Sequence, residues 1–438
     1  MSKVAIFGAG YTVKPMVDYF IDRCKYEVVV ATRTVSKAEK VIAGRSLGTA
    51  ISWTTDQVDL LETIIKDIDI VVLMVPRSVH HIVSEMCLKY RKPLITTDFM
   101  HPDIISFNEE AKKQNILFLT ELGESPGLDN MCSKQMIDLA KADGGKVISL
   151  TSYGSGIPSF EHNRTPFGYK FSWDPKGLMR SAVKPAVYQI EGKRIVAEIK
   201  FEDHKLVDID GIGTFEMYPN DDSTRYIPYF ELDSDVSIIR GLLRYLGYCN
   251  SITSLLKLKL IENTIENDVE NTTYAQFMSG LIGTTTTDTI RNDVANFLKI
   301  DSNDDIIKRL IWLGLFEDVQ ISIKRGTNTD VLVDLMLKKM SYAPHEKDMI
   351  IVHNEIVAEF PDRKEKRVSS MMVEGIPNGD TAMARAVSLP PAIAAKLILE
   401  DKIKAKGVCM PTTSEMYDPI LKEMETLGFS FKKKTIIL

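Results

Sequence analysis

Two glycines near the N-terminus are the first residues whose spacing points to chemistry. Gly8 and Gly10 follow the apolar run KVAIF, and Val13 stands at the third position of a GxGxxG-like turn, where glycine is usual. In such a turn the first glycine permits a tight bend and the second lets a pyrophosphate approach the backbone. We therefore expect a dinucleotide to bind at this turn, which comprises Gly8, Gly10, Tyr11, Thr12 and Val13.

The residues after the next apolar runs indicate which dinucleotide is bound. Arg33 and Thr34 end the run EVVVATRT, about twenty residues beyond the glycines, where an NAD-binding chain usually carries an acidic residue. An arginine at this place suits a 2′-phosphate, so it predicts NADP, although most exposed arginines have no such role. The run VVLMV ends in Val75 and Pro76, which we expect to line the ribose side of the cofactor.

The elements that position these residues indicate an α/β fold. Short apolar runs alternate with amphipathic helical stretches, and this order predicts a parallel sheet with crossover helices. Runs such as IVVLMV are apolar at consecutive positions, as in strands that are covered by helices on both faces. We predict a doubly wound Rossmann domain over residues 1–124, with residues 380–438 packing back on it. Residues 125–379 then form a second α/β domain for substrate binding and dimerisation, with a helical insertion near 250–325.

The C-terminal third shows two further patterns. The segments KDMIIVHNEIVAEF and KRVSSMMVEG predict an antiparallel pair of strands. The segment TAMARAVSLPPAIAAKLILEDKI predicts a long helix with an apolar face, which we expect Pro390 and Pro391 to interrupt.

Composition favours small-molecule partners. The net charge of −6 over 438 residues gives no overall positive field that would collect nucleic acid or an anionic membrane. No segment resembles a signal peptide, and we expect no apolar run of membrane-spanning length. The five cysteines are scattered without a CxxC pair, which argues against a zinc site or a disulfide framework and indicates a reducing compartment. We expect a cytoplasmic protein without a metal, and treat His162 as an ordinary loop histidine.

Several motifs together resemble a known family. They are VAIFGAGYTVKPMVDYF with VVVATRT, ELGESPGLDN, IPSFEHNRTPFGYKFSWDPKG, YPNDDST and IIRGLLRYLGY, followed by matching segments as far as PTTSEMYDPILKEM. In this order they resemble the saccharopine dehydrogenase family, of the NADP-dependent, L-glutamate-forming type also called saccharopine reductase. The resemblance implies hydride transfer that joins aminoadipate semialdehyde and glutamate through a reduced imine in lysine metabolism. It also implies a homodimer.

The chain departs from the family in the expected substrate pocket. The aspartate and terminal histidine of the family's EIGLDPGIDH are Ser125 and Asn130, while Glu121 and Asp129 are retained. The family's YPNRDST has become YPNDDST, and its TSSY has become TTDF, so two acids are gained and one base is lost. The resemblance implies no covalent catalyst, and we assign no catalytic residue. The substrate contacts that it implies are Asp98, Phe99, Ser125, Trp173, Asp221 and Arg244, of which Arg244 could hold a carboxylate bidentately.

These departures leave three functions open. In the first, Asp98, Ser125 and Asp221 are neutral changes and the chain has the family activity. In the second, the chain is an imine reductase of the same fold that acts on an amine or polyamine, because an acidic pocket favours a cation over a second carboxylate. In the third, it is a non-catalytic NADP-binding sensor or scaffold.

Overall fold

The computed structural model describes residues 1–438, and the chain divides into two compact units. The first unit consists of residues 1–154, 226–236 and 349–438. The second unit consists of residues 155–225 and 237–348. Both chain ends therefore belong to the first unit, which contains the glycine turn.

The first unit is built on a seven-stranded parallel sheet with the strand order β18-β6-β5-β4-β1-β2-β3. This is the predicted doubly wound Rossmann arrangement, and the central strands β1 and β4 are buried at every position except Lys3 because helices cover both faces. The strands are β1 (Lys3–Phe7), β2 (Glu27–Thr32), β3 (Gly48–Ser52), β4 (Ile70–Leu73), β5 (Leu94–Thr96), β6 (Leu117–Leu119) and β18 (Gly407–Cys409).

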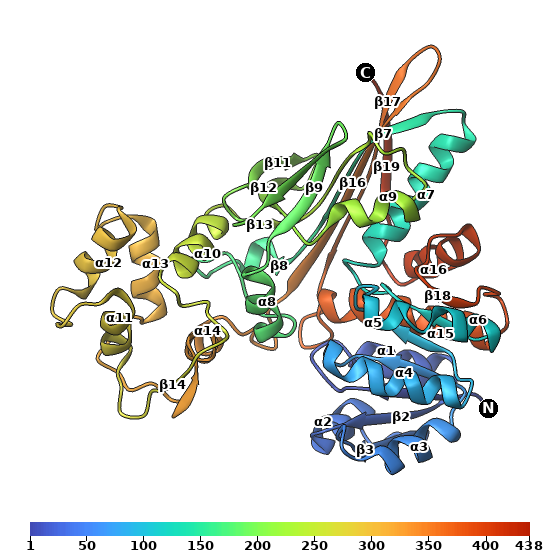
Figure 1. Ribbon diagram of the computed structural model, residues 1–438, viewed down its shortest axis with the longest axis horizontal. Coiled ribbons are helices and arrows are strands. Elements are labelled where there is room, and N and C mark those ends of the chain that lie inside the picture. The colour runs from blue at the N-terminus through green and yellow to red at the C-terminus, as the bar shows by residue number, and fades with distance from the viewer. The chain divides into compact units, whose positions relative to one another are not determined.

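Helices connect these strands and cover the sheet (Figure 1). The helices of the first unit are α1 (Lys14–Asp18), which continues as the π-helix η1 (Tyr19–Arg23), α2 (Val35–Ile42), α3 (Val58–Lys66), η2 (Arg77–Val79), α4 (His80–Lys89), α5 (Pro102–Ile105), α6 (Asn108–Lys113), α7 (Leu128–Ala142), α9 (Tyr226–Tyr229), α15 (Ala382–Leu399) and α16 (Ser414–Thr426).

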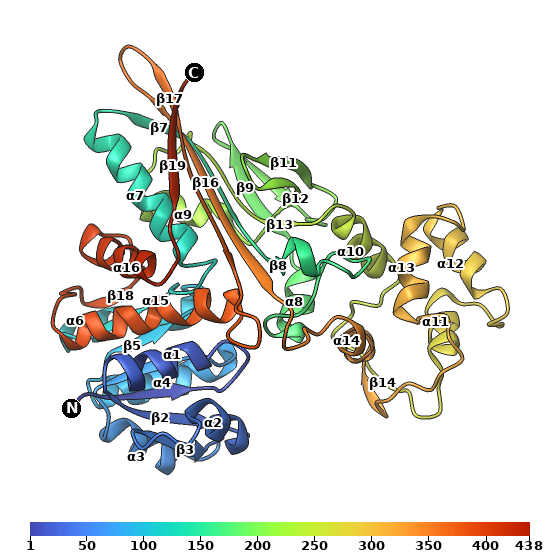
Figure 2. The ribbon, with the colours of Figure 1, turned by 180° about the vertical axis from the view of Figure 1, so that it is seen from behind.

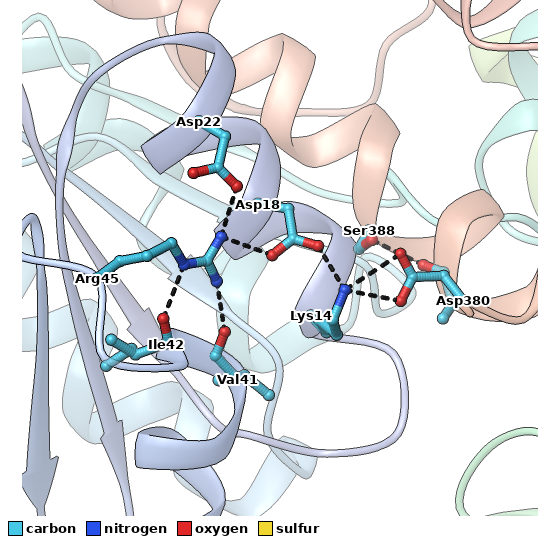
Figure 3. A network of polar contacts seen from close by, with 9 residues as sticks. Lys14, Asp18, Asp22, Val41, Ile42, Arg45, Asp380 and Ser388 are labelled. Atoms are coloured by element: carbon cyan, nitrogen blue, oxygen red, sulfur yellow. Dashed lines mark hydrogen bonds and ion pairs between the residues drawn. The ribbon is translucent and has the colours of Figure 1, made fainter. Parts of the chain in front are cut away.

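The C-terminal segment returns to the Rossmann sheet. Strand β18 pairs with β6, and α15 lies against α1 (Figure 2). A polar network joins the start of α1 to Asp380, two residues before α15 (Figure 3): Lys14 Nζ lies 2.6 Å from Asp18 Oδ2 and 3.1 Å from Asp380 Oδ1. Arg45 extends this network, since its Nη1 lies 2.7 Å from Asp18 Oδ1. Such exposed pairs add little stability, so the apolar contact of α15 holds this segment in place.

Helix α15 corrects two predictions. It runs without interruption through Pro390 and Pro391, although each proline removes a backbone donor from the helix. By length and composition it could cross a membrane, with a mean hydropathy of 1.4, so the expectation that no apolar run reaches that length is wrong. However, 72% of this segment is buried inside the structure, which is typical of a core helix. Its burial against the unit outweighs the hydrogen bonds that the prolines remove.

Four long strands complete the first unit: β7 (Lys146–Gly154), β16 (Asp348–Glu359), β17 (Lys364–Glu374) and β19 (Lys432–Ile437). The predicted antiparallel pair is confirmed, because β16 and β17 are paired from Met349 opposite Glu374 to Glu359 opposite Lys364. Strand β19 pairs with the other side of β17.

The second unit combines strands with a helical region. Its helical region packs around a core that includes Leu255, Met278 and Leu310. The predicted insertion near 250–325 is mainly helical, but it also contains a short strand pair, β14 with β15, that periodicity did not indicate. The strands are β8 (Gly156–Pro158), β9 (Ala186–Ile190), β10 (Lys193–Ala197), β11 (Lys205–Ile209), β12 (Gly213–Pro219), β13 (Ser237–Arg244), β14 (Glu266–Asp268) and β15 (Arg325–Thr327). The helices are η3 (Phe160–His162), α8 (Pro175–Ala182), η4 (Ser223–Arg225), α10 (Tyr248–Lys257), α11 (Tyr274–Ile282), α12 (Ile290–Leu298), α13 (Asp305–Leu313) and α14 (Asn328–Lys339).

The burial of α15 predicts a large stability effect at its centre. Ile393 is fully buried, so Ile393→Ala should lower the free energy of unfolding of the first unit by about 2–5 kcal/mol through lost contacts and a cavity. Ile437 is 62% exposed, and Ile437→Ala should change it by less than about 0.5 kcal/mol. Urea unfolding followed by tryptophan fluorescence and circular dichroism measures both. Equal small effects would show that α15 is not part of the core.

Candidate functional site

The turn after β1 is shaped by Gly8. Its φ is +112°, and a Cβ atom there would lie 2.3 Å from the carbonyl oxygen of Met74 and 3.2 Å from Cγ1 of Val75, so no other residue fits. Its N–H donates to the carbonyl of Ala31 at 2.8 Å. At Gly10, by contrast, a Cβ atom would meet nothing within 4 Å. The turn is therefore pressed against the end of β4 at Gly8 and open at Gly10, as a pyrophosphate requires.

The rest of the turn divides into exposed and buried residues. Tyr11 is 63% exposed and Thr12 is half-buried. Val13 is only 1% exposed and precedes α1, so its side chain packs in the core where the usual third glycine would bring helix and strand together. Any contact of Val13 with a nucleotide is thus limited to its backbone.

The residues expected around the ribose lie at the carboxyl ends of β2 and β4. Arg33 and Thr34 follow β2 and are exposed, and the Arg33 guanidinium forms no ion pair within the protein. Val75 and Pro76 follow β4, half-buried and exposed respectively. An unpaired cation at the end of β2 fits a 2′-phosphate, and nucleotides bind at this edge of open α/β sheets. The residues present therefore fit NADP.

Asp98 follows β5 and lies near two imidazoles. Its Oδ1 accepts a hydrogen bond from the N–H of Phe99 at 2.8 Å and lies 3.5 Å from Nε2 of His101. Burial alone would raise its pKa, but the hydrogen bond and charge of His101 and the charge of His80 together hold the pKa of Asp98 below its usual value. His80 is buried, which lowers its pKa, and its Nε2 lies 3.0 Å from the carbonyl oxygen of Val75. Asp98 is thus ionised at neutral pH, near the end of β4.

Ser125 lies in a tightly packed loop between β6 and α7. It is half-buried, whereas every other residue of the stretch 116–134 is buried. Its Oγ donates to Oδ2 of Asp129 at 2.7 Å, while Oδ1 of Asp129 accepts from the N–H groups of Gly127 at 2.9 Å and Asn130 at 2.7 Å. At Gly127, with φ +150°, a Cβ atom would lie 1.9 Å from the carbonyl oxygen of Gly123, so glycine is required. The loop holds the Ser125 hydroxyl in a defined orientation.

Glu121 joins the loops of Asp98 and Ser125. Its side chain is fully buried, and its Oε1 accepts from the N–H of Met100 at 3.0 Å. Its Oε2 accepts from Asn130 Nδ2 at 3.0 Å and from the Tyr226 hydroxyl at 2.8 Å. Its own N–H donates to the carbonyl of Asp98 at 3.1 Å. The hydrogen bonds of Glu121 thus tie the loop that carries Asp98 and Phe99 to the segment that carries Ser125, within the first unit.

Arg244 lies in the second unit, at the end of β13, in a cage of tyrosines. Its side chain is 3% exposed, and its guanidinium carbon lies 5.2 Å, 5.7 Å and 5.3 Å from the ring centroids of Tyr169, Tyr218 and Tyr248. Nη1 donates to the carbonyl of Leu243 at 2.7 Å, but Nε has no acceptor in the protein. A buried guanidinium with an unused donor is suited to an anion, because unpaired buried charge is costly.

Lys200 is a member of this cluster that sequence reasoning missed. It is fully buried, and its Nζ donates to the carbonyl of Ser181 at 2.8 Å and to Asn220 Oδ1 at 2.9 Å. Burial lowers the pKa of Lys200 to about 8, an effect that the charge of Arg244 adds to and the carboxylate of Asp221 opposes. Nothing in the local sequence EIKFED separates this lysine from an exposed one, because its burial arises from contacts distant in the sequence.

The other two predicted residues of the second unit are only half-buried. Asp221 follows β12 with φ +57°, and its Oδ1 accepts from the N–H of Asp222 at 2.7 Å. Trp173 packs against the core of the second unit. The electrostatic effects on Lys200 place Asp221 and Arg244 close to one lysine, whereas no described contact joins Trp173 to either.

Comparisons with family models give one family for both parts of the chain. Residues 4–119 match the saccharopine dehydrogenase NADP-binding domain, and residues 123–429 match the saccharopine dehydrogenase C-terminal domain. The two matches together cover the Rossmann sheet strands β1 to β6 and both groups of predicted substrate residues.

Proteins that are similar to this chain are named saccharopine dehydrogenase or α-aminoadipic semialdehyde synthase. The mitochondrial α-aminoadipic semialdehyde synthase of Bos taurus is 30% identical over 99% of this chain and 48% of that protein, so the chain spans about half its length. Saccharopine dehydrogenase [NADP(+), L-glutamate-forming] of Schizosaccharomyces pombe is 28% identical, over 100% of this chain and 99% of that protein. Among solved structures, apo saccharopine dehydrogenase (L-Glu forming) from Saccharomyces cerevisiae matches with a TM-score of 0.89 at 28% identity, covering 100% of both chains.

The unpaired guanidinium of Arg33 predicts a selective loss of NADPH affinity. Arg33→Ala should weaken NADPH binding about 10- to 100-fold, the range expected for one charge-assisted contact, because the 2′-phosphate loses its cation. NADH affinity should change less than about twofold. Fluorescence titration of the purified variant with each dinucleotide measures both. Arg291→Ala, an exposed arginine of the second unit, is the matched control. Equal losses for NADH and NADPH would contradict the assignment of Arg33.

Proposed function

The chain belongs to the saccharopine dehydrogenase family, and we propose that it is an NADP-dependent oxidoreductase acting on a C–N bond, of the L-glutamate-forming saccharopine dehydrogenase type. In this reaction the secondary amine of saccharopine is oxidised to an imine, whose hydrolysis gives aminoadipate semialdehyde and glutamate. The similar fungal proteins of the same length, which carry this activity in their names, support the proposal.

The chain's own residues supply binding and orientation rather than a covalent catalyst. Bound NADP⁺ would accept the hydride from the carbon next to the substrate nitrogen. Gly8 permits the tight turn against the end of β4, Gly10 leaves room for the pyrophosphate, and Arg33 would pair with the 2′-phosphate. Such chemistry depends on holding the reacting carbon in place and excluding water, which suits residues fixed by buried hydrogen bonds.

The observation that carries the proposal is the buried guanidinium of Arg244. Three tyrosine rings surround it, and its Nε lacks an acceptor in the protein. An amino-acid carboxylate would supply the missing acceptor and charge in bidentate geometry. Burying such a cation without a partner costs several kcal/mol, so an anionic ligand gives this position a physical reason.

Saccharopine should reduce NADP⁺ when mixed with the purified protein, followed as NADPH absorbance. Arg244→Lys removes the bidentate fork and should raise KM for saccharopine about 10- to 100-fold, with KM for NADP⁺ unchanged. Arg180→Lys, an exposed arginine of the same unit, is the control, and thermal denaturation checks that Arg244→Lys is folded. Tight NADPH binding without turnover of saccharopine by the wild-type protein would overturn the proposal. If the protein then oxidised substrates of an amine panel instead, it would be an imine reductase for amines. If it turned over no substrate at all, it would be a silent NADP-binding protein.

A second candidate, an imine reductase for amines or polyamines, is favoured by the charges near both groups of residues. Asp98 is ionised and half-buried in the first unit. In the second unit, Asp221 places a negative charge beside the buried cations Lys200 and Arg244 and the exposed Lys184, and so lowers the net positive charge available to a second carboxylate. An arginine at position 221, as the family pattern has it, would raise that charge instead. A substrate without the second carboxylate is therefore the natural alternative.

Asp98 discriminates between the two candidates. If it binds an ammonium group, Asp98→Ser should lower kcat/KM for spermidine-type amines about tenfold, because an ionic contact becomes a neutral one. For saccharopine kcat/KM should stay level or rise. Steady-state kinetics with both substrate classes measures the difference, with Asp59→Ser on the exposed face of α3 as the control. Since the pKa of Asp98 is held low, these values should not titrate with Asp98 between about pH 6 and 8. Equal losses for both classes would show that Asp98 has no part in selecting the substrate.

We further propose that the protein works in the cytoplasm as a homodimer on small-molecule substrates, without nucleic acid or membrane partners. All five cysteines are free, which fits a reducing compartment. The homodimer is supported by the family resemblance alone. Sedimentation equilibrium gives the oligomeric state, and fractionation of the source cells gives the compartment.

A further inference from the structure

We propose that Lys200 is a positioning residue for substrate binding, because its buried ammonium joins the last turn of α8 to the turn that follows β12. The inference rests on the proposed function, since Trp173 and Asp221, two of the expected substrate contacts, lie next to these two elements. All of these residues belong to the second unit.

The ammonium of Lys200 binds two separate segments of the chain. Its Nζ donates to the carbonyl of Ser181 at 2.8 Å and to Oδ1 of Asn220 at 2.9 Å. Ser181 lies in the last turn of α8, where the carbonyl groups form the negative end of the helix dipole and favour a cation. Lys200 is only 2% exposed and forms no ion pair, so these two acceptors are the main compensation for its desolvation.

The turn after β12 is itself fixed to the sheet. The N–H of Asn220 donates to the carbonyl of Arg240 at 2.9 Å, and the N–H of Val187 donates to the carbonyl of Asp221 at 2.8 Å. These backbone bonds hold the turn against β13 and β9. The bond from Lys200 to Asn220 therefore connects the last turn of α8 to a fixed corner of the sheet.

The position of α8 in turn determines where Trp173 lies. The helix begins directly after Asp174, whose side chain caps it by accepting from the N–H of Gly177 at 3.0 Å. The Trp173 ring packs on this first turn, since a Cβ atom at Gly177 would lie 3.1 Å from its Cζ3. Trp173 is thus carried by α8, and Lys200 holds it in place relative to Asp221.

The same ammonium also supports the cage around Arg244. Lys200 Nζ lies 5.9 Å from the ring centroid of Tyr218, and the guanidinium carbon of Arg244 lies 5.7 Å from the same centroid. The ring of Phe201, the next residue after Lys200, packs against Tyr218 with its centroid 4.6 Å away. Both contacts favour the present place of the Tyr218 ring, which forms one wall of the cage. Lys200 therefore positions part of the carboxylate site as well as α8.

Two variants separate this positioning role from the charge of Lys200. Lys200→Met retains the length of the side chain without its ammonium, and KM for saccharopine should rise about 10- to 100-fold because both charge-assisted bonds are lost. Asn220→Ala retains the ammonium and removes one acceptor, so KM should rise about tenfold. In both variants kcat should change less than about threefold, since substrate binding is what is weakened. NADPH affinity should stay as in the wild type.

An effect of charge alone would leave KM of Asn220→Ala within about twofold of the wild type, and that result would overturn the inference. Lys339→Met is the matched control, because this exposed lysine of the same unit also donates to a carbonyl, that of Trp312 at 2.6 Å. It should leave KM unchanged. Thermal denaturation checks that each variant is folded, and if Lys200→Met is not, Asn220→Ala decides by the same criterion.

A double-mutant cycle tests whether the two side chains act through one bond. In a Lys200→Met background, Asn220→Ala should change KM by less than about twofold, because the bond that it removes is already absent. Independent, additive increases would overturn the inference, although wild-type turnover of saccharopine would keep the proposed function.

If the wild type does not turn over saccharopine, the proposed function fails. Calorimetric titration of the NADPH-loaded protein with saccharopine then decides the inference by itself. Binding that both single variants weaken about tenfold or more would support the positioning role of Lys200. No binding, or binding that both variants leave unchanged, would overturn it.

Discussion

The buried carboxylate of Glu121 is the constraint on which the arrangement of the first unit's candidate site depends. Desolvating a carboxylate costs several kcal/mol unless hydrogen bonds compensate it. Here the compensation comes from Met100, Asn130 and Tyr226, which belong to the loop after β5, to α7 and to α9. Because each donor lies on a separate segment, the charge is stable only when the three segments are assembled together.

The positions of Asp98 and Ser125, two of the expected substrate contacts, follow from this constraint. Asp98 precedes Met100 by two residues, and its carbonyl also accepts from the N–H of Glu121. Ser125 lies between Glu121 and Asn130, the ends of one buried hydrogen bond. A shift of either loop would leave an unpaired donor or acceptor in the interior. The buried hydrogen bonds of Glu121 therefore hold both loops in place, without a direct contact between the side chains of Asp98 and Ser125. Side chains that are held in this way lose little entropy when a ligand binds.

How far the sequence predicts this structure depends on the range of the interactions. Strands β1, β2, β4, β5 and β6 are apparent from their consecutive apolar residues, because their burial on both faces is a local pattern. Strand β3 was not predicted, since it lies at the edge of the sheet, half-exposed and with the less apolar sequence GTAIS. Helix α15 runs through two prolines because burial outweighs the missing donors, a balance that only tertiary packing decides. The cofactor turn was visible as a motif, while Lys200 was not, since no local spacing encodes it.

Lys200 also changes the meaning of Asp221. Judged from the family motif alone, this aspartate would repel a substrate carboxylate, whereas the arginine that the family has at this position would attract it. In the structure it lies near a buried ammonium whose pKa burial lowers to about 8, and its charge raises that pKa. A lysine with a pKa of about 8 is mainly protonated at pH 7, whereas losing the opposing charge would shift it toward the neutral form. Asp221 therefore helps to keep Lys200 charged as well as reducing the net charge of the cluster. The family motif alone therefore does not give the net charge around Arg244, because Lys200 and Lys184 also contribute to it.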